Sequence, residues 1–173
     1  PILNSPMDTV ISYDLADILL GRGGMPVFNR RTSLEEYKEI YQRYAERVVV
    51  STCVNNIDEI KSIVDLGFDK VLLDTANGWH RRMLDTITEL RKYQEDLTII
   101  AGNVCVPQAV RDLINASVDA IRVGIGGGSA CCTRIVTAVG NPQFSAIYEC
   151  SEEAKRFKIP IIADGAIKSS REL

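Results

Sequence analysis

The sequence predicts an α/β fold, built from short buried strands that alternate with helices around a parallel sheet. Seven short apolar runs recur along the 173 residues, and the first six begin near positions 1, 25, 48, 70, 97 and 119. Their spacing of about 22 to 27 residues is what one strand followed by one helix requires. The segments between the runs carry helix-capping signals or apolar residues at helical spacing.

The apolar runs are predicted to be strands that are buried on both faces, because each is short and nearly continuous in apolar residues. They span residues 1–4, 25–28, 48–50, 70–74, 97–101, 119–123 and 159–164. The sixth and seventh runs begin about 40 residues apart, so the extra length lies in the glycine-rich segment that follows residue 123.

The helix starts are predicted from capping residues. Ser12 can cap a helix that continues to Leu20, where glycines follow. Ser33 and Glu36 have the spacing of a capping box, which opens a helix to about residue 45. Asn56 begins the next helix, which is expected to end at residue 67. Further helices are predicted over 81–93, 107–115 and 143–157 and from residue 169 onward.

The strand–helix repeat leaves two architectures open. A closed (β/α)8 barrel needs eight strands, so the sequence would supply about seven of its units and lack the eighth strand. An open, doubly wound sheet could use seven strands and is the alternative. In either case residues 1–173 are expected to form a single domain.

Composition and charge exclude several classes of protein. The net charge of -3 gives no basic footprint for nucleic acid, and no apolar run approaches the roughly 18 residues that span a bilayer. Five cysteines without a CxxC spacing indicate reduced thiols in a cytoplasmic protein, rather than disulfides or a zinc site. His80 is the only histidine, which excludes a multi-histidine metal site.

Polar and thiol side chains follow five of the predicted strands, at the ends where a barrel places its functional groups. Four glycines within residues 124–128 lead to Ser129, Cys131 and Cys132. Such a loop can cradle a phosphate with its amides, and a cysteine on it can attack the anchored ligand. The alternatives are a flexible surface loop with incidental cysteines, and helix caps or turns elsewhere. The other polar groups are Ser5, Asp8, Asp74, Asn77, Asn103 and Asp164.

Five segments together resemble the IMP dehydrogenase/GMP reductase family. The resemblance runs almost end to end and keeps the order of the motifs, and the glycine-rich cysteine loop followed by AVGNPQ at 138–143 is its most specific part. The segments are NSPMDTV at 4–10, LDTANG at 73–78, AGNV at 101–104, VGIGGGSACCTR at 123–134 and IADG at 162–165. The resemblance implies a (β/α)8 barrel that acts at C2 of a purine nucleotide.

The resemblance also implies the catalytic roles. Cys131 matches the nucleophile that forms a thioimidate with the purine, and a thiolate suits this step because it is nucleophilic at a modest pKa. Thr133 matches the residue that helps to activate the leaving group or water. The backbone carbonyls of Gly126, Gly128 and Cys131 match a monovalent-cation site, which would hold K+. Cys132 stands where the family usually has threonine and is expected to be a packed bystander.

The remaining matches concern substrate and cofactor. Asp164 matches the carboxylate that holds the ribose hydroxyls, and Ser129 and Gly165 match phosphate ligands. Asp74 and Asn77 are expected to lie beside the cofactor. Further substrate contacts are expected from Ser5, Met7 and Asn103.

Within the family, two features favour a GMP reductase, an oxidoreductase that converts GMP to IMP and ammonia with NADPH. The segment 42–48 runs on without the regulatory CBS insert that dehydrogenases usually carry there, and the segment 74–78 is closer to the reductase form. One alternative is an IMP dehydrogenase without its insert, which would oxidise IMP to XMP with NAD. The other is a catalytically inactive purine-nucleotide-binding fragment. The resemblance suggests a homotetramer. Ala166 departs from the usual Asp-Gly-Gly.

Overall fold

The computed structural model describes residues 1–30, 32–129, 131–138, 140–167 and 169. The chain divides into two compact units, one comprising residues 1–74 and 88–99 and the other residues 75–87 and 100–173. The first unit contains helices α1 (Tyr13–Gly21), α2 (Leu34–Tyr44) and α3 (Ile57–Val64), with the short helix η1 (Ala45–Arg47). Its strands are β1 (Val27–Phe28), β2 (Val49–Thr52) and β3 (Lys70–Asp74).

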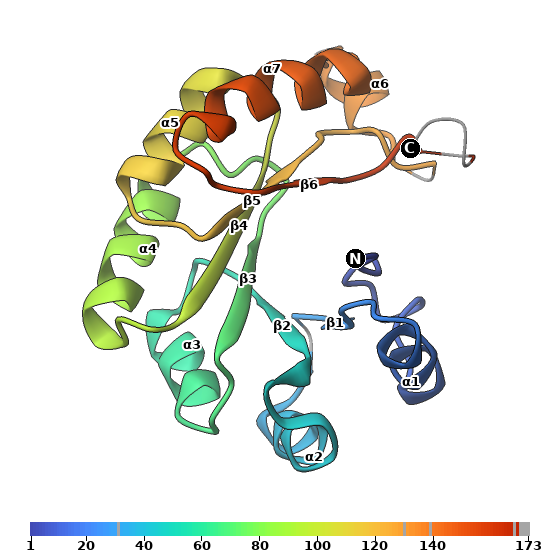
Figure 1. Ribbon diagram of the computed structural model, residues 1–173, viewed down its shortest axis with the longest axis vertical. Coiled ribbons are helices and arrows are strands. Elements are labelled where there is room, and N and C mark those ends of the chain that lie inside the picture. The colour runs from blue at the N-terminus through green and yellow to red at the C-terminus, as the bar shows by residue number, and fades with distance from the viewer. Residues whose placement is uncertain (31, 130, 139, 168, 170–173) are drawn as a thin grey trace. The chain divides into compact units, whose positions relative to one another are not determined.

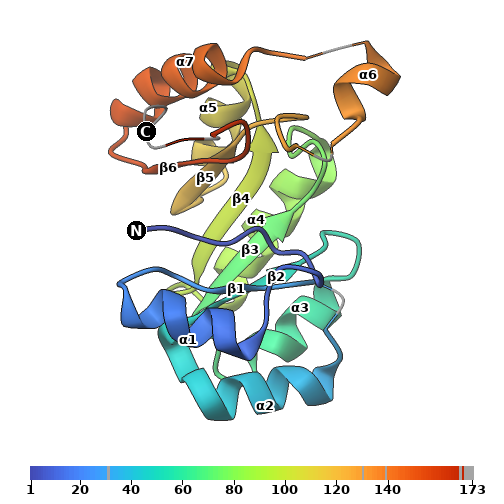
Figure 2. The same ribbon diagram turned by 90° about the vertical axis from the view of Figure 1, so that its right-hand side faces the viewer.

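The second unit contains helices α5 (Pro107–Asn115), α6 (Thr133–Thr137) and α7 (Gln143–Lys155), with strands β5 (Ala120–Val123) and β6 (Ile161–Ala163). Helix α4 (Arg81–Tyr93) and strand β4 (Thr98–Val104) contribute residues to both units. Figures 1 and 2 show α5 and α7 side by side. Arg111 Nε on α5 donates to Glu153 Oε1 on α7 at 2.8 Å, which ties the two helices together.

Within each unit, neighbouring strands are parallel and follow the order of the chain. Consecutive strands are also neighbours in a (β/α)8 barrel, whereas a doubly wound sheet reverses its order at a switch point. The prediction of a partial (β/α)8 barrel is therefore confirmed. All four residues of β2 and of β5 are buried, as expected for strands covered on both faces.

The helix starts agree with the capping signals. Ser12 accepts a hydrogen bond from the Leu15 amide, and Ser33 and Glu36 form both bonds of the capping box. Asn56 caps α3, although this helix ends at Val64, and residues 65–67 form a turn. Helix α6 was not predicted. The helix predicted from residue 169 onward falls on residues of which only Ser169 is described.

The strand predicted over residues 1–4 is wrong, because the described residues form six strands and not seven. Leu3 makes only an isolated parallel bridge to Met25. Beyond it, the Asn4 side chain takes over the pairing: Asn4 Oδ1 accepts from the Val27 amide at 2.8 Å, and Asn4 Nδ2 donates to the Val27 carbonyl at 2.9 Å. A side-chain amide thus supplies the donor and acceptor that a strand backbone would otherwise supply.

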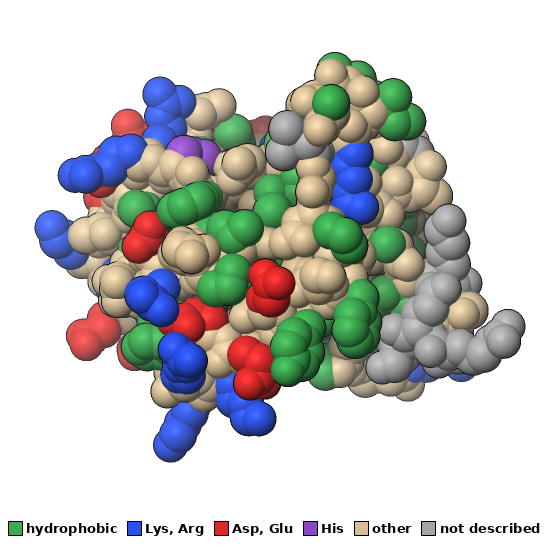
Figure 3. Space-filling model, turned by 90° about the horizontal axis from the view of Figure 1, so that it is seen from above, with side chains coloured by type: hydrophobic (Ala, Val, Ile, Leu, Met, Phe, Trp, Pro, Cys, Tyr) green, Lys and Arg blue, Asp and Glu red, His purple; other side chains and the backbone are tan. Residues whose placement is uncertain are grey.

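The surface is mixed in character. On the described part of the face in Figure 3, basic and acidic side chains alternate with hydrophobic ones and form no continuous basic patch. Exposed apolar side chains occur on α6, at Ile135 and Val136, and on α7, at Phe144 and Tyr148. In the described part of the chain, no helix combines the length and the apolar character needed to cross a membrane.

Candidate active site

The glycine-rich loop leaves strand β5 in close contact with the end of strand β6. Gly124 has φ +140°, and a Cβ at this position would collide with the Asp164 carbonyl and lie 2.6 Å from Gln143 Nε2. Gly165 has φ +81°, and its Cβ would lie 3.0 Å from the Gly127 carbonyl carbon and the Gly128 nitrogen. Glycine is needed at both positions, because only a residue without a side chain allows the backbones to approach this closely.

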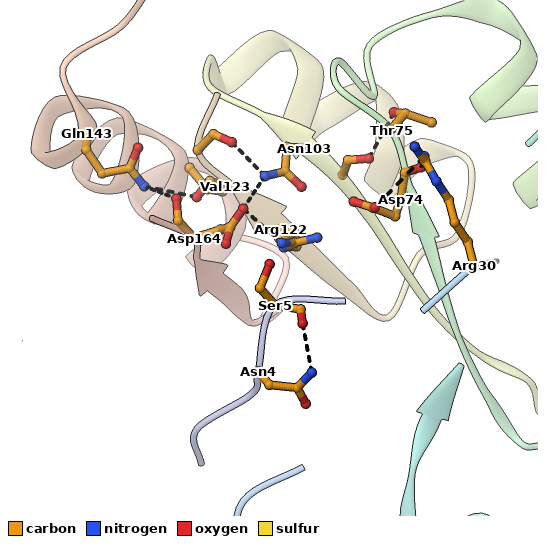
Figure 4. A network of polar contacts seen from close by, with 12 residues as sticks. Asn4, Ser5, Arg30, Asp74, Thr75, Asn103, Arg122, Val123, Gln143 and Asp164 are labelled. Carbon is orange, nitrogen blue, oxygen red and sulfur yellow. Dashed lines mark hydrogen bonds and ion pairs between the residues drawn. The ribbon is translucent and has the colours of Figure 1, made fainter. Parts of the chain in front are cut away.

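The Asp164 carboxylate is held by two buried side chains (Figure 4). Asp164 Oδ2 accepts from Asn103 Nδ2 at 2.6 Å and forms an ion pair with the Arg122 guanidinium at 3.0 Å. Asn103 Nδ2 also donates to the Gly124 carbonyl at 2.6 Å, so the same amide links the carboxylate to the glycine-rich loop. The Asp164 side chain keeps 30% of its surface exposed, which leaves the carboxylate accessible to a ligand.

The Asp164 backbone is fixed as well. Its amide donates to the Val123 carbonyl at 2.9 Å. Gln143 Nε2, at the start of α7, donates to the Asp164 carbonyl at 2.9 Å and to the Val123 carbonyl at 3.2 Å. The ends of β5 and β6 are therefore joined through one side-chain amide, as Figure 4 shows.

The Cys131 thiol is exposed and activated. Its Sγ is hydrogen-bonded to Thr133 Oγ1 at 3.2 Å, and hydrogen bonds from the Thr133 side chain and backbone lower the pKa of the Cys131 thiol. Burial instead raises the pKa of Cys105, and that of Cys150 to about 12. A lowered pKa increases the thiolate fraction at neutral pH, and the thiolate is the nucleophilic form. Among these three thiols, Cys131 is therefore the one suited to attack a substrate.

Arg134 holds the two ends of the cysteine loop. Its Nε donates to the Ile125 carbonyl at 2.9 Å, and its second guanidinium nitrogen donates to the Asn141 carbonyl at 2.7 Å. Asn141 Nδ2 in turn donates to the Cys105 carbonyl at 2.7 Å, next to the end of β4. The loop that carries Cys131 is thus tied to the scaffold by charge-assisted and amide hydrogen bonds.

The family model described as "IMP dehydrogenase / GMP reductase domain" matches residues 1–173. The chain belongs to this family. Inosine-5'-monophosphate dehydrogenase from Chlorobaculum tepidum is 42% identical over 144 residues, which are 83% of this chain and 29% of the relative. The enzyme of the same name from Bacillus subtilis is 41% identical over 136 residues, 79% of this chain and 28% of the relative. That from Halalkalibacterium halodurans is 46% identical over 114 residues, 66% and 24% of the two chains. The matched segment thus spans less than a third of each of these relatives.

The second unit brings several of the family's predicted site residues together. Asn103 contacts Asp164, Gly165 packs against the loop before Ser129, and Cys131 contacts Thr133. Ser129 and Cys132 are both exposed, so the expectation that Cys132 is packed is wrong. Cys132 is the N-cap residue of α6, and its side chain makes no capping hydrogen bond.

The first unit contains the other predicted substrate residues, Ser5 and Met7, together with Asp74. The Ser5 carbonyl accepts from the Met7 amide at 2.8 Å, and Met7 is 48% exposed. The Asp74 carbonyl accepts from Arg30 at 2.9 Å. Their roles toward a nucleotide remain predictions.

The residues of the predicted cofactor and cation sites make local hydrogen bonds. Asn77 Oδ1 accepts from the Trp79 amide at 2.9 Å, so this side chain closes a turn. The Gly128 carbonyl already accepts from the Cys131 amide at 3.0 Å, and a Cβ on Gly126 would lie 3.3 Å from Arg134 Nε. A carbonyl oxygen has two lone pairs, so these contacts do not test the predicted K+ site, and the cofactor and cation roles remain predictions.

Four residues that shape the site received no role from the sequence. Arg134, Asn141 and Gln143 lie within or just after the recognised cysteine motif, so the motif contained them without showing what they contact. Arg122 had a visible signal, since it is the one charged residue in the strand β5. A charged side chain in a run predicted to be buried on both faces requires a partner, and this pointed to an ion pair.

Proposed function

We propose that this chain forms the nucleotide-binding and nucleophile-bearing part of an IMP dehydrogenase, which oxidises IMP to XMP with NAD. The observation that carries the proposal is the exposed Cys131 thiol, whose pKa is lowered by Thr133. The names of the relatives support the dehydrogenase over the reductase that the segment 74–78 had favoured. The reductase remains the second candidate, on that segment and on the uninterrupted path from α2 to β2.

In the proposed reaction, Asp164 accepts hydrogen bonds from the ribose hydroxyls, and the amides of the glycine-rich loop, Ser129 and Gly165 receive the phosphate. The Cys131 thiolate adds to C2 of the purine, and C2 loses a hydride, which leaves a thioimidate. Bound NAD would supply the hydride acceptor. Water then attacks C2 and displaces the sulfur, with Thr133 placed to exchange a proton at the thiol because its hydroxyl already contacts Sγ.

We also propose that residues 1–173 belong to a single barrel domain without an inserted regulatory module after α2. This rests on the short path from α2 through η1 to β2, which occupies only residues 45–48. A homotetramer is proposed from the family resemblance, and a cytoplasmic location from five cysteines without a CxxC spacing.

The test uses the intact protein that contains this chain. We expect IMP-dependent reduction of NAD, protection of Cys131 from iodoacetamide by IMP, and loss of essentially all turnover in Cys131→Ala. Cys132→Ala is the matched control, because the neighbouring thiol is also exposed but has no role in the proposed reaction.

Other outcomes separate the alternatives. Oxidation of NADPH with GMP and release of ammonia, without NAD reduction by IMP, would identify a reductase. Protection of Cys131 by IMP without any turnover would identify a nucleotide-binding fragment. Protection of Cys132 instead of Cys131 would contradict the assignment of the nucleophile.

A further inference from the structure

Arg122 is a buried cation in the middle of the second unit. It belongs to β5 and is only 8% exposed. Removing a guanidinium from water is costly unless it is paired and hydrogen-bonded. A buried guanidinium at this position therefore needs a partner that pairs with its charge.

The register of the sheet directs Arg122 toward Asp164. Arg122 pairs with Ile162 on β6, and Asp164, two residues further along, lies on the same side of the sheet as Ile162. On the other neighbouring strand, Arg122 pairs with Gly102, where a Cβ would lie 2.7 Å from the Arg122 Cβ. The absence of a side chain at Gly102 leaves room for the arginine, which reaches Asp164 Oδ2 at 3.0 Å.

The contacts of Asp164 involve one carboxylate oxygen and both polar groups of its backbone, and together they fix its orientation. Arg122 and Asn103 both contact Oδ2, while the amide of Asp164 is bonded to Val123 and its carbonyl to Gln143. A carboxylate held at its backbone and at one oxygen cannot rotate freely about its side-chain torsions. The plane of the carboxylate is therefore set before any ligand arrives, which lowers the cost of ordering it on binding.

We infer that Arg122 is a positioning residue, which orients the Asp164 carboxylate and thereby sets selectivity for a nucleotide whose ribose carries both hydroxyls. The inference rests on the proposed function, in which Asp164 reads the ribose. Arg122 acts through the carboxylate and need not touch the nucleotide. A planar guanidinium suits this role better than an ammonium, because its nitrogens have a fixed geometry.

The test compares the affinities of IMP and 2′-deoxy-IMP by calorimetry, using the intact protein. A hydrogen bond to a charged group changes affinity by roughly ten- to a hundredfold. We expect the wild-type protein to prefer IMP by about that factor, and Arg122→Gln to reduce the preference to about threefold or less, with little change for 2′-deoxy-IMP. Asp164→Asn should give the same pattern, and the double variant should show little further loss.

Each result decides the inference. An equal loss of affinity for both nucleotides in Arg122→Gln would indicate a purely structural role, and full selectivity in that variant would also overturn the inference. If Arg122→Gln does not fold, Arg122→Lys decides: we expect selectivity lowered severalfold at near wild-type melting temperature, and unchanged selectivity would contradict the role of the guanidinium. A wild-type protein that binds neither nucleotide would instead refute the proposed function.

Discussion

Ala166 offers a stability test of the turn that follows Asp164. Its backbone has φ +59°, directly after Gly165 at φ +81°. An L-residue in the left-handed region places its Cβ too close to the following carbonyl oxygen, which costs about 1–2 kcal/mol. Glycine does not have this cost.

The expected effect of Ala166→Gly follows from two opposing free-energy contributions. Relief of the left-handed conformation stabilises the folded state by about 1–2 kcal/mol. The greater conformational freedom of glycine in the unfolded chain destabilises by about 0.4–1 kcal/mol. Their difference predicts that Ala166→Gly raises the free energy of unfolding by about 0.8 kcal/mol, the difference of the two midpoints, and by at most about 1.6 kcal/mol.

The assay is urea unfolding of the intact protein, in which the midpoint should rise at a constant slope with denaturant. Ala116→Gly is the matched control. Ala116 is the C-cap of α5 with φ −81°, so the same substitution there relieves no left-handed conformation. It should lower the free energy of unfolding by about 0.5–1 kcal/mol. Shifts of the same sign in the two variants would refute the argument from backbone conformation.

Three further predictions concern the thiol, the core and the loop. Thr133→Val should move the pH profile of Cys131 alkylation to higher pH, because the contact that lowers the thiol pKa and enlarges its thiolate fraction is lost; Thr133→Ser should keep the wild-type profile. Leu113→Ala should lower the free energy of unfolding by about 2–5 kcal/mol in urea, since this side chain is 0% exposed, and a loss below about 1 kcal/mol would contradict its place in the core. Gly124→Ala should weaken IMP binding in calorimetry, because its Cβ would lie 2.6 Å from Gln143 Nε2; wild-type affinity would show that the loop does not need this close approach.

The local signals in the sequence determined most of the secondary structure. The capping box of Ser33 and Glu36 and the cap at Asn56 depend on side chains three residues from the amides they accept, so spacing alone identifies them. The apolar runs likewise predict buried parallel strands, because a strand covered on both faces has no polar side to show. The sequence motifs also identified Cys131 and Asp164 as candidate site residues, because the motifs occur in the same order as in the family.

The tertiary structure alone decided the contacts between distant residues. Asn103 reaches Asp164 across 61 positions of the chain, and Asn4 replaces a strand by bonding to Val27 across 23 positions. The partner of Arg122 depends on strand register, which brings Asp164 to the same side of the sheet. Local periodicity predicts which residues are buried but not which of them contact one another, so it does not predict these pairs. Which buried groups meet is set by the register of neighbouring strands and by the glycines that let their backbones approach.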